Sequence, residues 1–409
     1  MLCVPEGLLS AWRRSCCWCF GRYFFVWGRH IPASTWARVL PGFDFAERAF
    51  GASPVGGVPR VVAIWLGILT VGVASVFVLG HFRNDLQRPE VTAWSVSHFL
   101  SLGAFCGLSV ELVTKVYVSR WYDVTTMMTN PGAVPVFGQR LLLVWPAMLL
   151  KHLVPRLSYL KAFAIIQVIG IAIATYVIGE WSALFVGRSK FLGQIMVSLF
   201  LLPTFVYVQG HDVGVVITYT LCFLCLYKRQ YWWFGSAFCL GVLNHQNILL
   251  LIPTAVAIMW KREKLSNVFW LAVLTTTAYF TIHAILNSVV PIAYAYEERV
   301  WWNMRSIAEM RKEMMYAVLL IGPWYVAGAV ALGCADPFLR RATVLFPMQV
   351  GVFFLYGQLN EARMFNGFVP VLVGILLCFL RDHYLQGDRA SVGGLNAAKA
   401  ECTARKTLA

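Results

Sequence analysis

Charged residues are scarce in this chain. Only 13% of its 409 residues are Asp, Glu, Lys or Arg, whereas soluble proteins carry about 25%. Hydrophobic residues make up 59%, and apolar stretches long enough to cross a hydrocarbon layer of roughly 30 Å recur between residues 61 and 381. These stretches are continuous rather than alternating, which excludes a transmembrane barrel. The composition therefore predicts an all-α, polytopic transmembrane helical bundle.

Nucleotide-binding and metal-binding signatures are also missing. The sequence contains no P-loop and no dinucleotide-binding fingerprint. Cys222 and Cys225 form a CxxC pair, but neither a second pair nor a histidine follows at zinc-like spacing, so we interpret both as structural. We expect no metal site and no cofactor. One divalent ion shared by Asp85 and another outer acid stays open as an alternative.

The basic residues are confined to short loops and to the two ends of the chain. The net charge is +15, and this placement is typical of cytoplasmic retention of Lys and Arg in membrane proteins. It predicts contact with membrane lipids and no nucleic-acid partner. The basic clusters are 188–190, 228–230, 261–264, 340–341 and Arg381, and the polar clusters that alternate with them are 81–90, 211–212, 244–247, 297–312 and 360–363.

The alternation of these clusters predicts an orientation. Counting back from a cytoplasmic C-terminal tail places every polar cluster on the outer face and the basic clusters on the inner face. Acids, amides and imidazoles gathered on one face of a membrane protein are candidates for chemistry there.

Three regions are expected along the chain. Residues 1–60 form a basic cytoplasmic or disordered leader, residues 61–385 the transmembrane bundle, and residues 386–409 a disordered cytoplasmic tail. The bundle should contain about ten to twelve helices. The clearest predicted spans are 61–80, 161–181, 191–209, 213–227, 268–291, 315–333, 342–357 and 364–381.

Two regions leave the helix count open. Residues 231–260 are too long for one span and are broken at 244–247, so we expect two short helices that bring both flanking basic loops to one face. Residues 99–110 and 141–150 are apolar but short. They are either two short spans or helices that lie on the outer face, and both choices leave the downstream orientation unchanged.

Two carboxylates at the predicted membrane edge are candidate catalytic residues. Asp85 follows the first span and Asp123 follows Tyr122, each with cations nearby. A carboxylate in such a place can deprotonate a hydroxyl while the cations hold a leaving phosphate. The alternative is a solvated acid that pairs with a neighbouring Arg.

The other polar clusters supply candidate binding residues. The turn at 244–247 suits sugar hydroxyls or phosphate, but its amides and imidazole can instead satisfy the broken backbone. His211 and Asp212 precede a span, where Asp212 could also act as a helix cap. Glu361 and Arg363 open the last span. Arg363 suits a phosphate oxygen, or an ion pair between helices.

Taken together, these features resemble bacterial integral-membrane glycosyltransferases of the GT-C type. The resemblance covers about residues 61–381 and rests on short motifs. The motifs are Asp85 after the first helix, Tyr122-Asp123 before the Pro135–Pro146 stretch, Asp212 at a helix start, Asn244-His245-Gln246-Asn247, and Asn360-Glu361-x-Arg363.

The resemblance implies that an outer-loop carboxylate acts on the acceptor hydroxyl and that the sugar donor is a polyprenyl phosphate. Asp85 is then the first choice of base and Asp123 the second. Arg140 and Arg363 become candidates for the donor phosphate, and Asn244, His245 and the remaining polar residues for substrate binding. The loop after the first span lacks the paired acids often found in this family.

These expectations combine into one functional hypothesis. The chain is expected to be a multi-pass protein of the bacterial inner membrane that moves a hexose or pentose from a polyprenyl-phosphate carrier to a cell-envelope acceptor on the periplasmic side. A transporter or flippase of lipid-linked glycan is one alternative, and a glycan polymerase or ligase is another. Sparse polar groups within the apolar runs disfavour ion-coupled transport.

Overall fold

The described part of the chain is entirely helical in its regular structure. The structure is a computed structural model that describes residues 100–105, 108–109, 112, 126, 128–129, 140–204, 212–289, 300–308, 312–357 and 365–383. The α-helices are α8 (Leu141–Leu153), α9 (Tyr159–Val186), α10 (Phe191–Thr204), α11 (Asp212–Tyr227), α12 (Tyr231–Val242), α13 (Leu251–Met259), α14 (Leu265–Val289), α15 (Val300–Ala308), α16 (Lys312–Ala331), α17 (Pro337–Ala342), α18 (Leu345–Tyr356) and α19 (Val369–His383). Short 3₁₀ turns are η2 (Gly187–Ser189), η4 (Gln246–Leu250) and η5 (Leu332–Cys334). The all-α class is confirmed for these ranges.

Three helical segments are long and apolar enough to cross a membrane. They are α9, with 28 residues and a mean hydropathy of 2.2, α14, with 25 residues and 1.5, and Pro337–Tyr356, with 20 residues and 1.3. This property follows from length and composition alone. The other apolar helices, such as α8, α11 and Gln246–Met259, are shorter.

The core lies where α9, α11 and α19 meet. Trp181 on α9 is fully buried, and its indole N–H donates a 2.8 Å hydrogen bond to the carbonyl of Pro370 on α19. Its ring contacts Phe185, Tyr227 and Phe338 with centroids 5.0–6.2 Å apart. Pairing of the indole N–H is what burial of Trp requires, and this hydrogen bond joins α19 to α9, while the ring contacts join α9 to α11 and α17.

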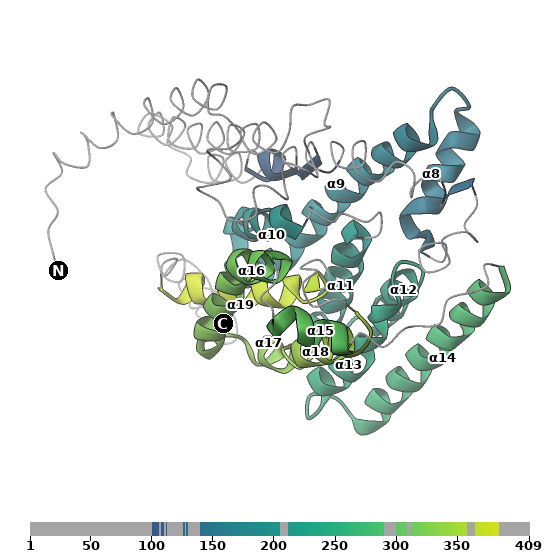
Figure 1. The fold of residues 1–409 in the computed structure, drawn as a ribbon. Coiled ribbons are helices and arrows are strands. Elements are labelled where there is room, and N and C mark those ends of the chain that lie inside the picture. The colour runs from purple at the N-terminus through teal and green to yellow at the C-terminus, as the bar shows by residue number, and fades with distance from the viewer. Residues whose placement is uncertain are drawn as a thin grey trace, which may run out of the picture.

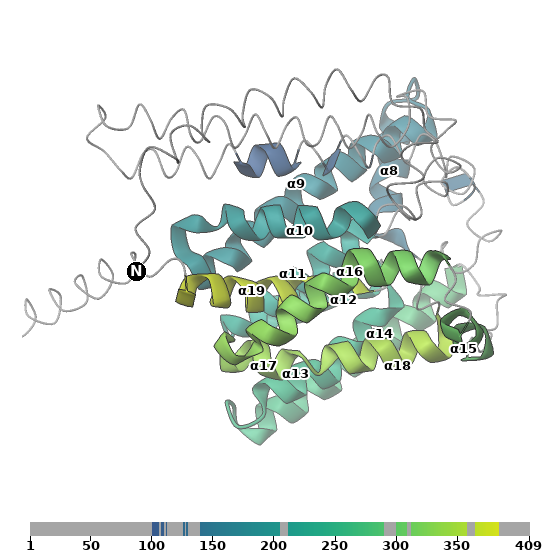
Figure 2. The same cartoon turned by 60° about the vertical axis from the view of Figure 1, so that its left-hand side comes forward.

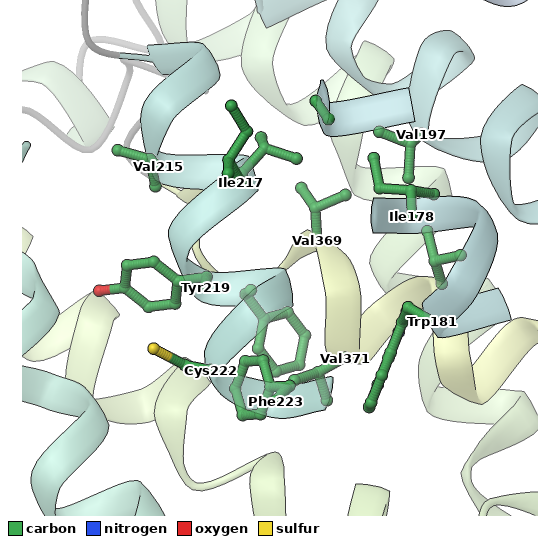
Figure 3. Close-up of a cluster of buried hydrophobic side chains, with 14 of the residues drawn as sticks. Ile178, Trp181, Val197, Val215, Ile217, Tyr219, Cys222, Phe223, Val369 and Val371 are labelled. Carbon is green, nitrogen blue, oxygen red and sulfur yellow. The ribbon is translucent and has the colours of Figure 1, made fainter. Parts of the chain in front are cut away.

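Figure 3 shows this core from the side of α11. Phe223, Val369 and Val371 lie between α11 and α19, whereas Tyr219 and Cys222 point to the opposite side of α11. Cys222 is buried and has no disulfide partner, as expected for a small apolar side chain. Helix α11 is enclosed within the bundle, since 13 of its 16 residues are buried, and in Figure 2 much of it is hidden behind α19 and α16.

One end of the bundle collects basic turns and is called the basic end here. Arg229, after α11, lies 3.5 Å from a carboxylate oxygen of Glu263, before α14. Arg341 on α17 donates hydrogen bonds to the carbonyls of Ile258 and Trp260 at the end of α13. The clusters 228–230, 261–264 and 340–341 therefore lie together, as the alternation of charge predicts.

The break within residues 231–260 forms as expected. Helix α12 ends at Val242, the chain turns at residues 243–245, and η4 and α13 lead back to the basic end. The ion pair between Arg229 and Glu263 shows that both flanking basic loops share that end. We call the opposite end of α11 and α12, where residues 243–247 lie, the polar end.

The two short apolar segments, 99–110 and 141–150, take different places in the bundle, as far as their residues are described. Ser101 donates a hydrogen bond to Gln194, which itself donates to the carbonyl of Thr175 at 2.8 Å, so the first segment lies beside the middle of α9. Helix α8 instead begins at the polar end, where the amide of Leu141 donates to the carbonyl of Leu243 at 2.7 Å. It then runs along the first half of α9, away from α11 (Figure 1).

Helix α14 lies at the edge of the bundle, as Figure 1 shows. Only 17% of its most apolar window is buried. Its exposed side chains include Phe269, Trp270, Phe280 and Ile285, each 58–61% exposed. The helix contacts α12 and α13 on one side and leaves a wide aromatic and aliphatic face uncovered.

Candidate functional site

The centre of the candidate site is the turn at residues 243–247, between α12 and η4. The turn satisfies part of its own backbone. His245 has an extended backbone, and its Nδ1 accepts a 3.1 Å hydrogen bond from the amide of Asn247, which caps η4. The amide of Asn244 donates to the carbonyl of Gly241 at 3.0 Å. Nδ1 of His245 therefore satisfies the broken backbone, which is one of the two roles expected for the polar groups of this turn.

Asn244 lies against the first turn of α11. Its side chain is 1% exposed, and a Cβ placed on Gly214 would lie 2.2 Å from its Oδ1 and 2.6 Å from its Cγ. The amide thus occupies the space that any larger residue at position 214 would fill. Asp212, which opens α11, is 4% exposed and lies two positions before that glycine. A carboxylate and an amide are thereby held at one helix N-terminus, where the helix dipole favours anions.

Arg140 reaches the same turn from α8. It is the residue before α8, and the first two amides of that helix, of Leu141 and Leu142, donate to the carbonyl of Leu243 at 2.7 and 3.3 Å. The start of α8 is therefore fixed on the residue that precedes Asn244. Arg140, Asp212 and Asn244 come from three different helices, and the fold brings all three to the polar end.

A buried polar network lies below the turn, one to two helical turns deeper along α11. The hydroxyl of Tyr219 donates a 2.6 Å hydrogen bond to the carbonyl of Asn247 and is also hydrogen-bonded by the side chain of Gln349 on α18. Gly367 packs on both side chains, because a Cβ there would lie 2.7 Å from Gln349 Nε2 and 2.7 Å from Tyr219 Cε1. The network therefore links α11, η4, α18 and the segment before α19.

Asn366 adjoins this network and has unused hydrogen-bonding capacity. Its side chain is 1% exposed, and neither Oδ1 nor Nδ2 has a partner among the described residues. Oε1 of Gln349 is unpartnered in the same sense. Buried amides without partners are rare in proteins and mark sites where a polar group from outside the chain can bind.

The remaining predicted site residues lie outside the described ranges. They are Asp85, Asp123, His211, Glu361 and Arg363. His211 is the chain neighbour of Asp212, and Arg363 precedes Asn366 by three positions. Of the predicted site residues, the structure describes Arg140, Asp212, Asn244 and His245, and these four lie at one end of the bundle.

Sequence reasoning missed Tyr219 and Asn366 and gave Gln349 no role. Each occurs within or beside an apolar run, where a single polar residue has no distinctive pattern. Of these three residues, only Gln349 can be recognised in the sequence, because it is an isolated amide in the predicted span 342–357. The network depends on the crossing of α11, α18 and the start of α19, which local sequence does not encode.

Several hydroxyls elsewhere in the interior are satisfied within their own helices, whereas the Tyr325 hydroxyl and Nε2 of His283 are buried without a hydrogen-bond partner among the described residues. The hydroxyls of Ser198, Thr218 and Thr220 each donate to a backbone carbonyl four residues earlier, at 2.6–2.8 Å. Within the described ranges, no group of three His, Cys, Asp or Glu side chains is placed to hold a metal ion. The chain matches no protein-family model, no curated protein and no solved structure.

Proposed function

We propose that this chain is a multi-pass protein of the bacterial inner membrane that transfers a sugar from a polyprenyl-phosphate donor to a cell-envelope acceptor. Membrane placement is supported by the exposed apolar faces. Soluble monomers rarely leave a contiguous apolar surface as large as that of α14 uncovered. Trp232 is 89% exposed and Trp301 82% exposed, as expected of side chains in the headgroup region.

The observation that carries the proposed activity is the convergence at the polar end. Arg140 and Asp212 lie at helix starts that adjoin the turn carrying the Asn244 amide. The unpartnered amide of Asn366 is next in the chain to Gly367, which packs against Tyr219 below that turn. Arg binds phosphate oxygens through paired hydrogen bonds, and amides bind sugar hydroxyls. This set fits a sugar phosphate attached to a lipid.

The proposed reaction is an inverting displacement. Asp85, with Asp123 as the second choice, removes the proton of the acceptor hydroxyl. The hydroxyl oxygen then forms a bond to the anomeric carbon while the bond from that carbon to the phosphate oxygen breaks. Arg140 and Arg363 stabilise the charge that develops on the departing polyprenyl phosphate, and Asn244, His245 and Glu361 orient the sugar.

The test is transfer from a defined donor. Membranes containing the protein are incubated with radiolabelled polyprenyl-phosphate hexoses and pentoses, and label in the delipidated envelope fraction is measured. We expect Asp85→Asn to abolish transfer while the amount of folded protein is unchanged. Retained transfer in Asp85→Asn and in Asp123→Asn would refute the base assignment. Movement of labelled lipid between leaflets without transfer would favour the flippase alternative.

A further inference from the structure

We propose that the two adjoining turns at the basic end, residues 228–230 and 260–264, form a binding site for the headgroup of an anionic phospholipid. The proposal rests on the membrane placement proposed above, but not on sugar transfer. The site lies at the end of the bundle opposite to Asn244, and none of its residues belongs to the candidate active site.

The first observation is that cations occupy backbone positions that favour glycine. Arg229 has a φ of 58° and Lys261 a φ of 63°, both in the left-handed region. At the first turn the amide of Gln230 donates to the carbonyl of Cys225 at 2.8 Å, and that of Arg229 to Leu226 at 3.2 Å. This is a Schellman helix end, whose left-handed residue is usually Gly. A long cationic side chain at such a position is strained, and strain of this kind is typical of functional sites.

The second observation is that the cations of this end divide into two groups. Arg341 is used internally, since it donates to the carbonyls of Ile258 and Trp260. Arg262 lies over the ring of Phe338 at 5.6 Å. These two side chains hold the turns against α13 and α17.

The second group faces outward. Lys228, Lys261 and Lys264 are exposed and pair with no carboxylate among the described residues. The carboxylate between the two turns is that of Glu263, which is already bound to Arg229 and is largely buried, with 15% of its side chain exposed. The outward charge is therefore positive and uncompensated.

The third observation identifies the kind of anion. Trp232, Trp233 and Trp260 flank the turns and are 89%, 68% and 53% exposed. Indole rings favour the boundary between headgroups and acyl chains, and Lys and Arg beside them favour lipid phosphates. Cations bordered by exposed indoles fit a phospholipid headgroup better than a free anion, because a water-soluble phosphate has no apolar part for the rings to contact.

The experiment uses the full-length protein in a mild neutral detergent. Its unfolding midpoint is measured with added phosphatidylglycerol or phosphatidylcholine, and retained lipids are counted by native mass spectrometry. We expect phosphatidylglycerol to raise the midpoint more than phosphatidylcholine does. Each cation near an anionic surface contributes about a fivefold preference, so Lys228→Gln/Lys261→Gln should weaken phosphatidylglycerol retention about 25-fold.

Two further variants make the test specific. Arg156→Gln/Lys161→Gln removes the same charge from exposed positions near the turn between α8 and α9 and should leave retention unchanged. Lys261→Gly relieves the left-handed strain at that position and leaves the ion pair between Arg229 and Glu263 intact. It should keep or raise the unfolding midpoint in lipid-free detergent while it weakens the response to phosphatidylglycerol.

Several results would overturn the proposal. Equal responses to both lipids, equal losses in the control variant, or a glycine variant that is already unstable without lipid would each assign these cations a general or structural role. A response reproduced by inorganic phosphate at equal ionic strength would assign a free-anion site instead. Failure of the protein to fractionate with membranes would refute the membrane placement itself, and that outcome is distinguishable from all the others.

Discussion

The phenol of Tyr219 donates a 2.6 Å hydrogen bond to the backbone carbonyl of Asn247, and this bond ties the turn at residues 243–247 to the middle of α11. The two residues belong to different helices and meet only because α12 folds back along α11. The depth of the candidate site in the bundle is therefore set by a buried side chain rather than by the turn alone.

Removal of that hydroxyl is the most direct test of the link. In Tyr219→Phe the carbonyl of Asn247 and the amide of Gln349 both lose a partner while the ring remains, so we expect a loss of about 1–2 kcal/mol of stability. Tyr325→Phe is the matched control, because its buried hydroxyl has no partner among the described residues. That change should alter stability by less than about 0.5 kcal/mol. The unfolding midpoint in detergent measures both, and equal effects would contradict the assigned role.

The contact between Gly214 and Asn244 predicts a second effect. A Cβ at position 214 would lie 2.2 Å from Asn244 Oδ1, so Gly214→Ala must displace the amide. We expect a loss of about 1–3 kcal/mol and a large fall in sugar transfer. Gly235→Ala in α12 is the control, since no atom lies within 4 Å of the added Cβ, and it should gain about 0.5–1 kcal/mol. A well-folded, fully active Gly214→Ala protein would show that Asn244 has no role in the site.

Asn366 should separate stability from activity. Its buried amide makes no hydrogen bond within the described chain, so Asn366→Leu replaces an unsatisfied polar group with an apolar one of the same branching. We expect stability to be unchanged or higher and transfer to be lost. The free energy of unfolding and the transfer rate are measured on the same preparation. If both fall together, Asn366 has a structural role.

Side-specific labelling tests the orientation of the two ends. Single cysteines replace Lys161 or Trp301 near the polar end and Lys228 or Lys264 at the basic end, all exposed positions. On a cysteine-depleted background, an impermeant maleimide should label the first pair in intact cells and the second only after permeabilisation. Labelling divided within either pair would rule out the proposed orientation.

The sequence predicts helices well where a charge or turn bounds an apolar run. The predicted span 213–227 corresponds to Asp212–Tyr227, since the polar pair His211-Asp212 marks its start in the sequence and Lys228 follows it. The predicted span 161–181 is shorter than the helix, because α9 begins at Tyr159 and continues beyond Trp181 to Val186. Glu180 lies 3.7 Å from Lys190, and the neighbouring Trp181 is buried against α19, so both are accommodated inside a helix. Such tertiary compensation is not encoded locally.

The candidate site is only partly predictable for the same reason. Asn244 and Asp212 interrupt or border apolar runs and are conspicuous in the sequence, and the structure brings both to the polar end. Tyr219, Gln349 and Asn366 become neighbours only through the packing of three helices. The last helix begins at Val369 rather than near residue 364, because residues 365–368 form a turn in which Gly367 packs against Tyr219 and Gln349.

The carbonyl of Leu243 accepts the first two amides of α8, at 2.7 and 3.3 Å, and it precedes Asn244 directly in the chain. The position of Asn244 and the start of α8 are therefore fixed by the same stretch of backbone. The exposed turn around Arg156 follows the far end of α8, so a fluorophore attached there would test whether displacement of Asn244 is transmitted along that helix.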